Sequence, residues 1–131
     1  MVAFITALAA LSAIFSTAIA APAQDDSTHA LETRANRGRI THYNPGVGFG
    51  ACGWRNSDAE FVVAVGHALY DAQHPCNRKI RVSYQGRSAV VRVVDRCGGC
   101  GYNDIDLSPA AFRNVIGNLD IGVVTTTWEW V

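Results

Sequence analysis

The chain has 131 residues, and its 11 basic and 11 acidic side chains cancel to a formal net charge of zero. This length suits one small globular domain, and the balanced charge argues against a basic nucleic-acid-binding surface. We therefore expect no nucleic-acid partner.

The first stretch of the chain, "MVAFITALAALSAIFSTAIA", is apolar and uncharged, and it ends in the small-x-small pattern Ala18-Ile19-Ala20. This pattern predicts a signal peptide over residues 1–20 that is cleaved on secretion. The alternative is a membrane anchor, because the stretch is just long enough to span a bilayer. The polar residues that follow favour cleavage. We therefore expect a secreted, extracellular protein that has no membrane contact in its mature form.

Residues 21–37 contain few large apolar side chains, which predicts a flexible N-terminal arm. The domain is then expected over residues 38–131. A core of this size usually needs covalent or metal staples.

All four cysteines lie in this domain, and an even number of cysteines in a secreted chain predicts two disulfides. The alternative is a zinc site, because Cys97 and Cys100 have the spacing of metal ligands. Cys52 and Cys76 are isolated in the sequence instead of forming a second C-x-x-C, so we expect no metal and no cofactor.

Strand patterns dominate the domain. "RITHY" (39–43) opens it, and "KIRVSY" (79–84) alternates apolar with polar residues. Gln85-Gly86 predicts a turn into "SAVVRVVD" (88–95), which carries valines on both faces, so we expect it to be buried on most of both sides. "GVVTTTWEWV" (122–131) predicts a final strand that can close a barrel.

Two helices are expected between these strands. The capping-box pattern Ser-Asp-Ala-Glu (57–60) precedes apolar residues at helical spacing, which predicts a helix over 61–69. Ser108 predicts the N-cap of a second helix, with Pro109 at its first position and Gly117 at its end. The order β, α, ββ, α, β indicates a small closed barrel with helices in its connections.

Three segments together carry a family resemblance: "ITHYNPGVGFGACGW" (40–54), "CNRKIRVSYQGRSAVVRVVDRCGGCGYNDIDLSPAAF" (76–112) and "TTTWEWV" (125–131). They resemble the expansin and rare-lipoprotein-A group, especially its single-domain secreted fungal members, the loosenin-like proteins. The resemblance covers residues 38–131. It implies an all-β fold with short helices, the six-stranded double-psi β-barrel.

The resemblance also implies a disulfide between Cys52 and Cys76 and a second between Cys97 and Cys100. The sequence itself leaves a crossed pairing open.

In that family the Asp of a "DLS" motif lies in an open groove, beside a Thr of the first strand and an Asp that ends the central strand. The matching residues here are Asp106, Thr41 and Asp95, which the resemblance implies as polysaccharide-binding residues. Asp106 alternatively rests against the start of the second helix. Asp95 alternatively fixes a turn or pairs with Arg96.

Sugar recognition also requires aromatic faces, and Tyr43, Trp54 and Tyr102 are the candidates. Trp128 and Trp130 share one face of the last strand, so at least one of them is expected in the core.

Hydrolysis is not expected. Inverting glycosidases need two carboxyl groups, and the endoglucanases built on this barrel carry their base shortly after the first strand. This chain has Asn44 and Pro45 there, and neither can accept a proton from water. We also expect the start of the second helix to hold Asp106 in its charged form, which a general acid cannot use.

These inferences predict a monomeric protein without catalytic residues that binds and loosens cell-wall polysaccharide, cellulose or chitin. Two alternatives remain. One is a secreted protein-binding or defence-related module, such as an inhibitor of a secreted cysteine protease, which would use loops instead of the groove. The other is a lytic transglycosylase-like enzyme that cleaves peptidoglycan with one carboxyl group, that of Asp106.

Overall fold

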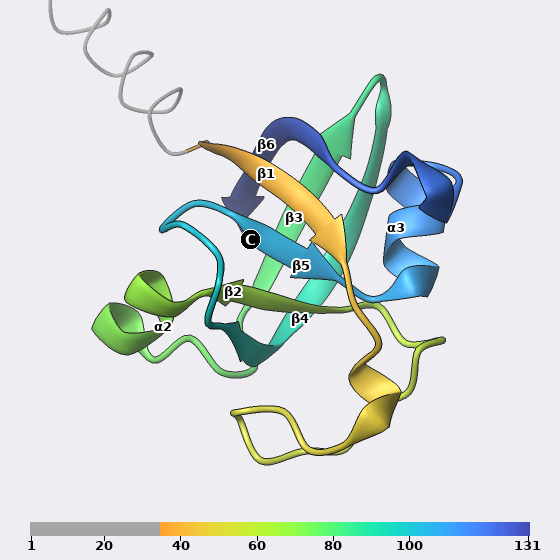
Figure 1. Ribbon diagram of the computed structural model, residues 1–131. Coiled ribbons are helices and arrows are strands. Elements are labelled where there is room, and N and C mark those ends of the chain that lie inside the picture. The colour runs from red at the N-terminus through yellow and green to blue at the C-terminus, as the bar shows by residue number, and fades with distance from the viewer. Residues whose placement is uncertain (1–34) are drawn as a thin grey trace, which may run out of the picture.

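The computed structural model describes residues 35–131, which fold into a closed barrel of six strands with two short α-helices (Figure 1). The strands are β1 (Asn36–His42), β2 (Val62–Gly66), β3 (Lys79–Tyr84), β4 (Arg87–Cys97), β5 (Ile105–Leu107) and β6 (Val124–Trp130). The helices are α2 (His67–Gln73) and α3 (Pro109–Val115), with single 3-10 turns η1 (Pro45–Val47) and η2 (Leu119–Ile121).

Around the barrel the strands follow the order β1-β5-β2-β4-β3-β6. The pairs β1–β5 and β2–β4 are parallel, and the other pairs are antiparallel. This arrangement confirms the expected six-stranded double-psi β-barrel.

The predicted signal peptide (1–20) and most of the predicted arm (21–37) lie outside the described residues. Strand β1 begins at Asn36, slightly before the expected start of the domain at residue 38. None of the helices in residues 35–131 combines the length and the apolar character that crossing a bilayer requires.

Alternate side chains of the strands fill the barrel, as a period of two predicts. Ile40 of β1 and both Val63 and Val65 of β2 are fully buried, and Phe112 of α3 packs onto the same core. The largest buried side chain belongs to Trp128 of β6, which fulfils the expectation that one of the last two tryptophans lies in the core.

Strand β4 is less buried than its valine-rich sequence predicts. Val91 and Val93 face the core, but Val90 is 40% exposed on the outer face. Val94 is also buried, because the loop that carries Cys52 lies over it and the Cys52 N–H donates to the Val94 carbonyl oxygen at 3.1 Å. The outer face of this strand is therefore covered only where a loop crosses it.

The predicted helix over residues 61–69 is wrong. Val62–Gly66 form strand β2, and helix α2 covers only His67–Gln73. One of the two hydrogen bonds of the capping box does form, from the Ser57 N–H to the Glu60 carboxylate at 2.7 Å. This bond closes a turn instead of starting a helix. The β-branched residues of this segment favour extended backbone, and pairing with both β4 and β5 outweighs the local helix signal.

Helix α3 begins as predicted. The Ser108 hydroxyl accepts a hydrogen bond from the Ala111 N–H at 3.3 Å, and Pro109 follows at the first helical position. The helix ends at Val115, and Gly117 next to it has a φ of +136°, a conformation that favours glycine.

Ser108→Ala is expected to lower the free energy of unfolding by about 1–3 kcal/mol. Besides capping α3, the fully buried Ser108 hydroxyl donates to the Glu60 carbonyl oxygen at 2.6 Å and lies 3.4 Å from the Val62 N–H. Alanine would leave these backbone groups without their partner. Urea denaturation measures the loss, and Ser88→Ala, at an exposed position of β4, is the control. Equal losses in the two variants would contradict this role.

Candidate functional site

Four positions form one row across the outside of four adjacent strands. Thr41 of β1 pairs with Asp106 of β5, and Asp106 also pairs with Ala64 of β2. Ala64 in turn pairs with Asp95 of β4. Neighbouring strands lie about 4.8 Å apart, so this central row spans roughly 14 Å from the hydroxyl of β1 to the carboxylate of β4.

A β-bulge brings Asp95 into the central row. Val63 of β2 pairs with Val93 of β4, whereas the next pair joins Ala64 to Asp95 and skips Val94. Without the extra residue, strict alternation would turn Asp95 toward the core, because Val93 already faces inward. The bulge therefore places a second carboxylate on the same outer face as the carboxylate of β5.

Thr41 and Asp106 are in direct contact. The Thr41 hydroxyl donates to Asp106 Oδ1 at 2.8 Å, which fixes the carboxylate in the row. Burial raises the pKa of the Asp106 carboxyl, and the charge of Asp95 raises it further, while the Thr41 hydrogen bond and His42 lower it. The start of α3 was expected to favour the charged form of Asp106, but the net shift has the opposite sign, because desolvation outweighs the stabilising contacts.

Tyr43 lies between the two carboxylates of the row. Its backbone N–H donates to the Leu107 carbonyl oxygen at 2.9 Å, which extends the contact of β1 with β5 beyond the end of the strand. Burial, followed by the charges of Asp95 and Asp106, raises the pKa of its phenol, so the hydroxyl keeps its proton. Asp95 is near this buried hydroxyl, but no group meets hydrogen-bond geometry with it. It is a donor without a partner in the described structure.

Asp95 combines a structural role with its place in the row. Its Oδ1 accepts hydrogen bonds from the N–H groups of Ala51 and Arg96, each at 2.8 Å, and so it fixes the loop after η1. The predicted contact with Arg96 is thus made by the backbone, whereas the Arg96 guanidinium pairs with Asp71 at 2.9 Å. Both backbone bonds fall on Oδ1, so neither of them uses Oδ2.

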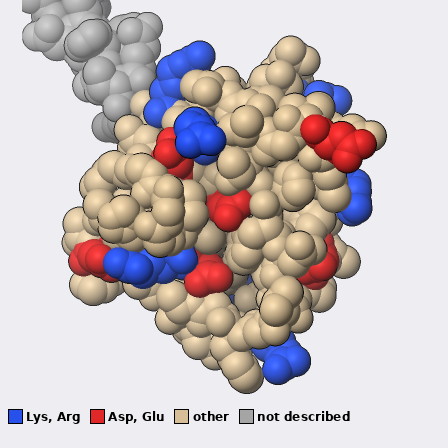
Figure 2. Space-filling view, viewed as in Figure 1, with Lys and Arg blue, Asp and Glu red and all other residues tan. Residues whose placement is uncertain are grey.

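Two depressions border the central row, one toward each of its ends. One of about 240 Å³ is lined by Thr41 and Asp106 together with the Cys97–Cys100 turn. The other, of about 280 Å³, is lined by Tyr43, Asp95 and the loop after η1. We call the two depressions and the row between them the groove. Acidic side chains emerge separately on this face, and basic ones form no continuous patch between them (Figure 2).

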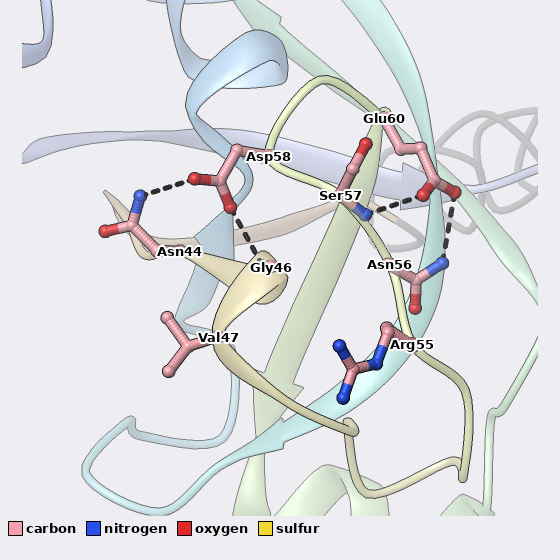
Figure 3. Close-up of a pocket in the computed structure, with 8 residues that line it drawn as sticks. All are labelled: Asn44, Gly46, Val47, Arg55, Asn56, Ser57, Asp58 and Glu60. Carbon is pink, nitrogen blue, oxygen red and sulfur yellow. Dashed lines mark hydrogen bonds between the residues drawn. The ribbon is translucent and has the colours of Figure 1, made fainter.

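A third depression of about 590 Å³ lies between η1 and residues 55–60, outside the central row (Figure 3). Asn44 donates to Asp58 Oδ2 and the Gly46 N–H donates to Asp58 Oδ1, each at 2.9 Å. The Asn44 hydrogen bond, followed by that of Gly46, lowers the pKa of the Asp58 carboxyl. Asp58 therefore serves to hold the η1 turn in place.

Of the three predicted aromatic residues, only Tyr43 lines the groove. Trp54 is 39% exposed beside the guanidinium of Arg92, whose Cζ lies 5.0 Å from the ring centroid. Tyr102 is 46% exposed, and its hydroxyl accepts a hydrogen bond from Gln73 at 3.2 Å. Neither Trp54 nor Tyr102 lines either depression of the groove, so the structure does not bring them to the predicted site.

Two residues of the groove are absent from the sequence-based prediction. Ala64 was assigned to a helix, and its place between two carboxylates depends on strand pairing that the local sequence does not encode. Asp104 also lines the groove, and its two oxygens accept hydrogen bonds from the N–H groups of Arg39 and Gly101, each at 2.9 Å. The only local signal is its position between the C-x-x-C segment and β5.

All four cysteines are paired, Cys52 with Cys76 and Cys97 with Cys100. The predicted two disulfides are confirmed with the pairing that the family resemblance implied. Neither the crossed pairing nor a zinc site with four thiolates is formed.

Asp106→Asn is expected to raise stability at neutral pH. In the wild type the folded-state pKa of this carboxyl lies above its ordinary value of 3.8, so the folded chain binds the proton more tightly. Stability is therefore highest below the ordinary value and falls as pH rises through the folded-state pKa. The variant lacks this titration, and its advantage should vanish in acid. Thermal unfolding across this pH range measures it, and a variant that is less stable at neutral pH would contradict it.

Comparison with known proteins extends these observations. Residues 36–128 match the double-psi β-barrel family model described as Lytic transglycolase. The papain inhibitor of Streptomyces mobaraensis is 37% identical over 102 residues, which cover 72% of this chain and 70% of that protein.

Solved structures show the same relationships. The Streptomyces papain inhibitor has a TM-score of 0.66 at 34% identity, covering 74% of this chain and 94% of that one. A mutant of the Clavibacter michiganensis expansin in complex with cellohexaose has a TM-score of 0.65 at 29% identity. That match covers 74% of this chain, which spans only 50% of the expansin.

Proposed function

Because this chain belongs to the double-psi β-barrel family described as Lytic transglycolase, and resembles the expansins within that fold, we propose that it is an expansin- or loosenin-like protein. It binds cell-wall polysaccharide, cellulose or chitin, and loosens it without hydrolysis. The observation that carries this proposal is the central row, in which hydroxyl and carboxylate groups of neighbouring strands line one groove. The relative solved in complex with cellohexaose supports a glycan as the ligand.

Each polar group of the groove has a distinct role in this proposal. The Thr41 hydrogen bond orients Asp106, whose second oxygen accepts a hydrogen bond from a sugar hydroxyl. Asp95 Oδ2 accepts from another hydroxyl, and the buried Tyr43 hydroxyl lies beside this carboxylate. A hydrogen bond between neutral groups is worth about 1 kcal/mol net, and one to a charged carboxylate is worth about 1.5–3 kcal/mol. The protein thereby replaces hydrogen bonds between glycan chains with its own, and no covalent bond breaks.

Catalysis is the point on which the family description and this proposal differ. The raised pKa of Asp106 suits a general acid, but Asp95 already uses Oδ1 to hold two backbone N–H groups. In this proposal Asp95 Oδ2 accepts from a sugar hydroxyl instead of taking a proton from water, so hydrolysis has no general base. Lytic cleavage needs only one carboxyl group, so product analysis has to accompany any binding measurement.

Incubation with insoluble cellulose, chitin and peptidoglycan tests the proposal. The protein should be depleted from solution by cellulose or chitin, and mass spectrometry of the supernatant should find no new soluble sugars. Anhydro-sugars released from peptidoglycan would replace the proposal with the lytic enzyme. No depletion by any of the three polymers would overturn the binding function itself.

Inhibition of a papain-like cysteine protease is the second candidate, because a papain inhibitor is 37% identical to this chain. The end of η1 and the loop that follows it suit protein binding, since Val47 is 85% and Phe49 is 71% exposed. A bridge pairs Phe49 with Arg55, whose guanidinium carbon lies 5.1 Å from the centroid of the Phe49 ring. The Cys52–Cys76 disulfide holds the same loop. An apolar loop that is already ordered loses little conformational entropy on binding.

Val47→Ser combined with Phe49→Ser is expected to weaken papain inhibition by roughly tenfold or more, since exposed apolar anchors carry most interface energy. The control combines Ile121→Ser with Val123→Ser, which changes side chains of comparable type that are 47% and 42% exposed near η2. Inhibition constants measure the effect. Absence of inhibition by the wild type, or equal weakening in both variants, would exclude this function for the loop.

A further inference from the structure

The Cys97–Cys100 disulfide borders the groove without having a role in glycan binding. Both cysteines line the depression of about 240 Å³ at the central row. The two residues between them, Gly98 and Gly99, are exposed, and no atom lies within 4 Å of the position that a Cβ would take on either. Cys97 and Cys100 are themselves partly exposed, so a dissolved thiol can approach this turn from the groove.

The other disulfide has different surroundings. The Tyr70 hydroxyl lies 3.4 Å from Cys76 Sγ and 3.9 Å from Cys52 Sγ, so an aromatic side chain packs against both sulfurs. Neither cysteine lines the groove. Their sequence separation is 24, compared with 3 for Cys97 and Cys100, so the Cys52–Cys76 bond restricts far more of the unfolded chain.

The loop that follows Cys100 has anchors that do not depend on its disulfide. Asp104 holds it through the Gly101 N–H and is itself bound to the Arg39 N–H, each at 2.9 Å. The loop also packs directly on β2, where a Cβ at Gly66 would overlap the Gly101 carbonyl oxygen. The turn itself is closed by a backbone bond from the Cys100 N–H to the Cys97 carbonyl oxygen at 3.3 Å.

These observations meet the requirements for reversible exchange. All four cysteines are partly buried, so the two disulfides differ in their surroundings. Cys97–Cys100 borders a depression and two exposed glycines, whereas Tyr70 packs against the sulfurs of Cys52–Cys76. Disulfides that a dissolved thiol can reach are the labile ones in proteins. The loop anchors do not involve this bond, and the backbone bond between Cys97 and Cys100 closes the turn independently of the two sulfurs.

We propose that Cys97–Cys100 is a thiol–disulfide exchange site in the wall of the groove, and that its partner is a dithiol. A thiolate of the dithiol attacks one sulfur, which forms a mixed disulfide and releases the other cysteine as a thiolate that takes a proton from solvent. The second thiol of the partner then displaces the remaining cysteine. The products are a reduced Cys97 and Cys100 pair and an oxidised, disulfide-bonded partner. This site is independent of the proposed glycan binding.

Timed reduction of the native protein tests this assignment. Dithiothreitol is added at neutral pH without denaturant, free thiols are trapped with N-ethylmaleimide, and peptide mass spectrometry locates the label. Cys97 and Cys100 should be labelled while Cys52 and Cys76 stay oxidised, and circular dichroism of the labelled protein should show the barrel retained. Simultaneous reduction of both disulfides, or earlier reduction of Cys52–Cys76, would overturn the proposal.

Paired serine variants provide a second measurement. Cys97→Ser with Cys100→Ser should leave a folded protein, whereas Cys52→Ser with Cys76→Ser should shift the unfolding equilibrium further, by on the order of tenfold from the difference in loop length. A larger loss in the first variant than in the second would show that the turn is a structural staple, which contradicts its proposed role as an exchange site.

Discussion

Asp106→Asn is expected to weaken binding of cellohexaose by roughly tenfold or more, because a hydrogen bond to a charged acceptor is worth about 1.5–3 kcal/mol. The amide has nearly the same shape as the carboxylate and can still accept the Thr41 hydrogen bond, which is 2.8 Å long in the wild type. What it loses is the negative charge and one acceptor toward the ligand. Isothermal titration of both proteins measures the change.

Measuring the stability of Asp106→Asn distinguishes a loss of sugar binding from a loss of folding. Removing a partly buried carboxylate whose pKa is raised should make the fold more stable at neutral pH, so weaker binding cannot arise from unfolding. Asp120→Asn, on η2 beside α3, makes the same chemical change outside the groove and should bind as the wild type does. Equal affinity of all three proteins would remove Asp106 from the site.

Trp128→Ala is expected to lower the free energy of unfolding by about 3–5 kcal/mol, the largest stability effect that we foresee for a single substitution. The side chain is 1% exposed and packs edge-on against Trp130 with ring centroids 5.3 Å apart. Its indole Nε1 donates to the Asn103 carbonyl oxygen at 2.8 Å, so the core also holds the loop before β5. Urea denaturation measures the loss.

Trp128→Phe separates the two contributions of this residue. Phenylalanine refills most of the volume but cannot donate to the Asn103 carbonyl, so it should recover much of the lost stability and retain a deficit of about 1 kcal/mol from the hydrogen bond. If Trp128→Phe is as unstable as Trp128→Ala, burial of the ring is not the main contribution.

Much of the barrel could be predicted from local patterns. Alternation of apolar and polar residues located β3 and β6, and the turn at Gln85-Gly86 has positive φ at both residues, as expected of a tight hairpin. Strand β2 was mistaken for a helix for two reasons. All five of its residues are buried, so it lacks the alternation of apolar and polar residues that marks a half-exposed strand. It also follows a capping-box pattern. Strand β5 has only three residues, too few for a periodic signal.

Part of the candidate site could likewise be predicted from the sequence, and part depends on the assembled fold. The resemblance to expansins led to Thr41 and Asp106, which are hydrogen-bonded in the structure. The place of Asp95 depends on a bulge, and that of Ala64 on pairing with two strands distant in sequence. The raised pKa of Asp106 arises from burial by the assembled barrel, which the helix-start argument did not take into account. Register and desolvation are tertiary properties, so no local pattern could supply them.

An NMR titration of the labelled protein with cellohexaose tests the central claim most directly. We expect the largest shifts of backbone amides on the central row, at Thr41, Ala64, Asp95 and Asp106, which occupy paired positions on four adjacent strands. Shifts that are confined to the exposed loop around Phe49, or no shifts at a saturating concentration of the sugar, would contradict it.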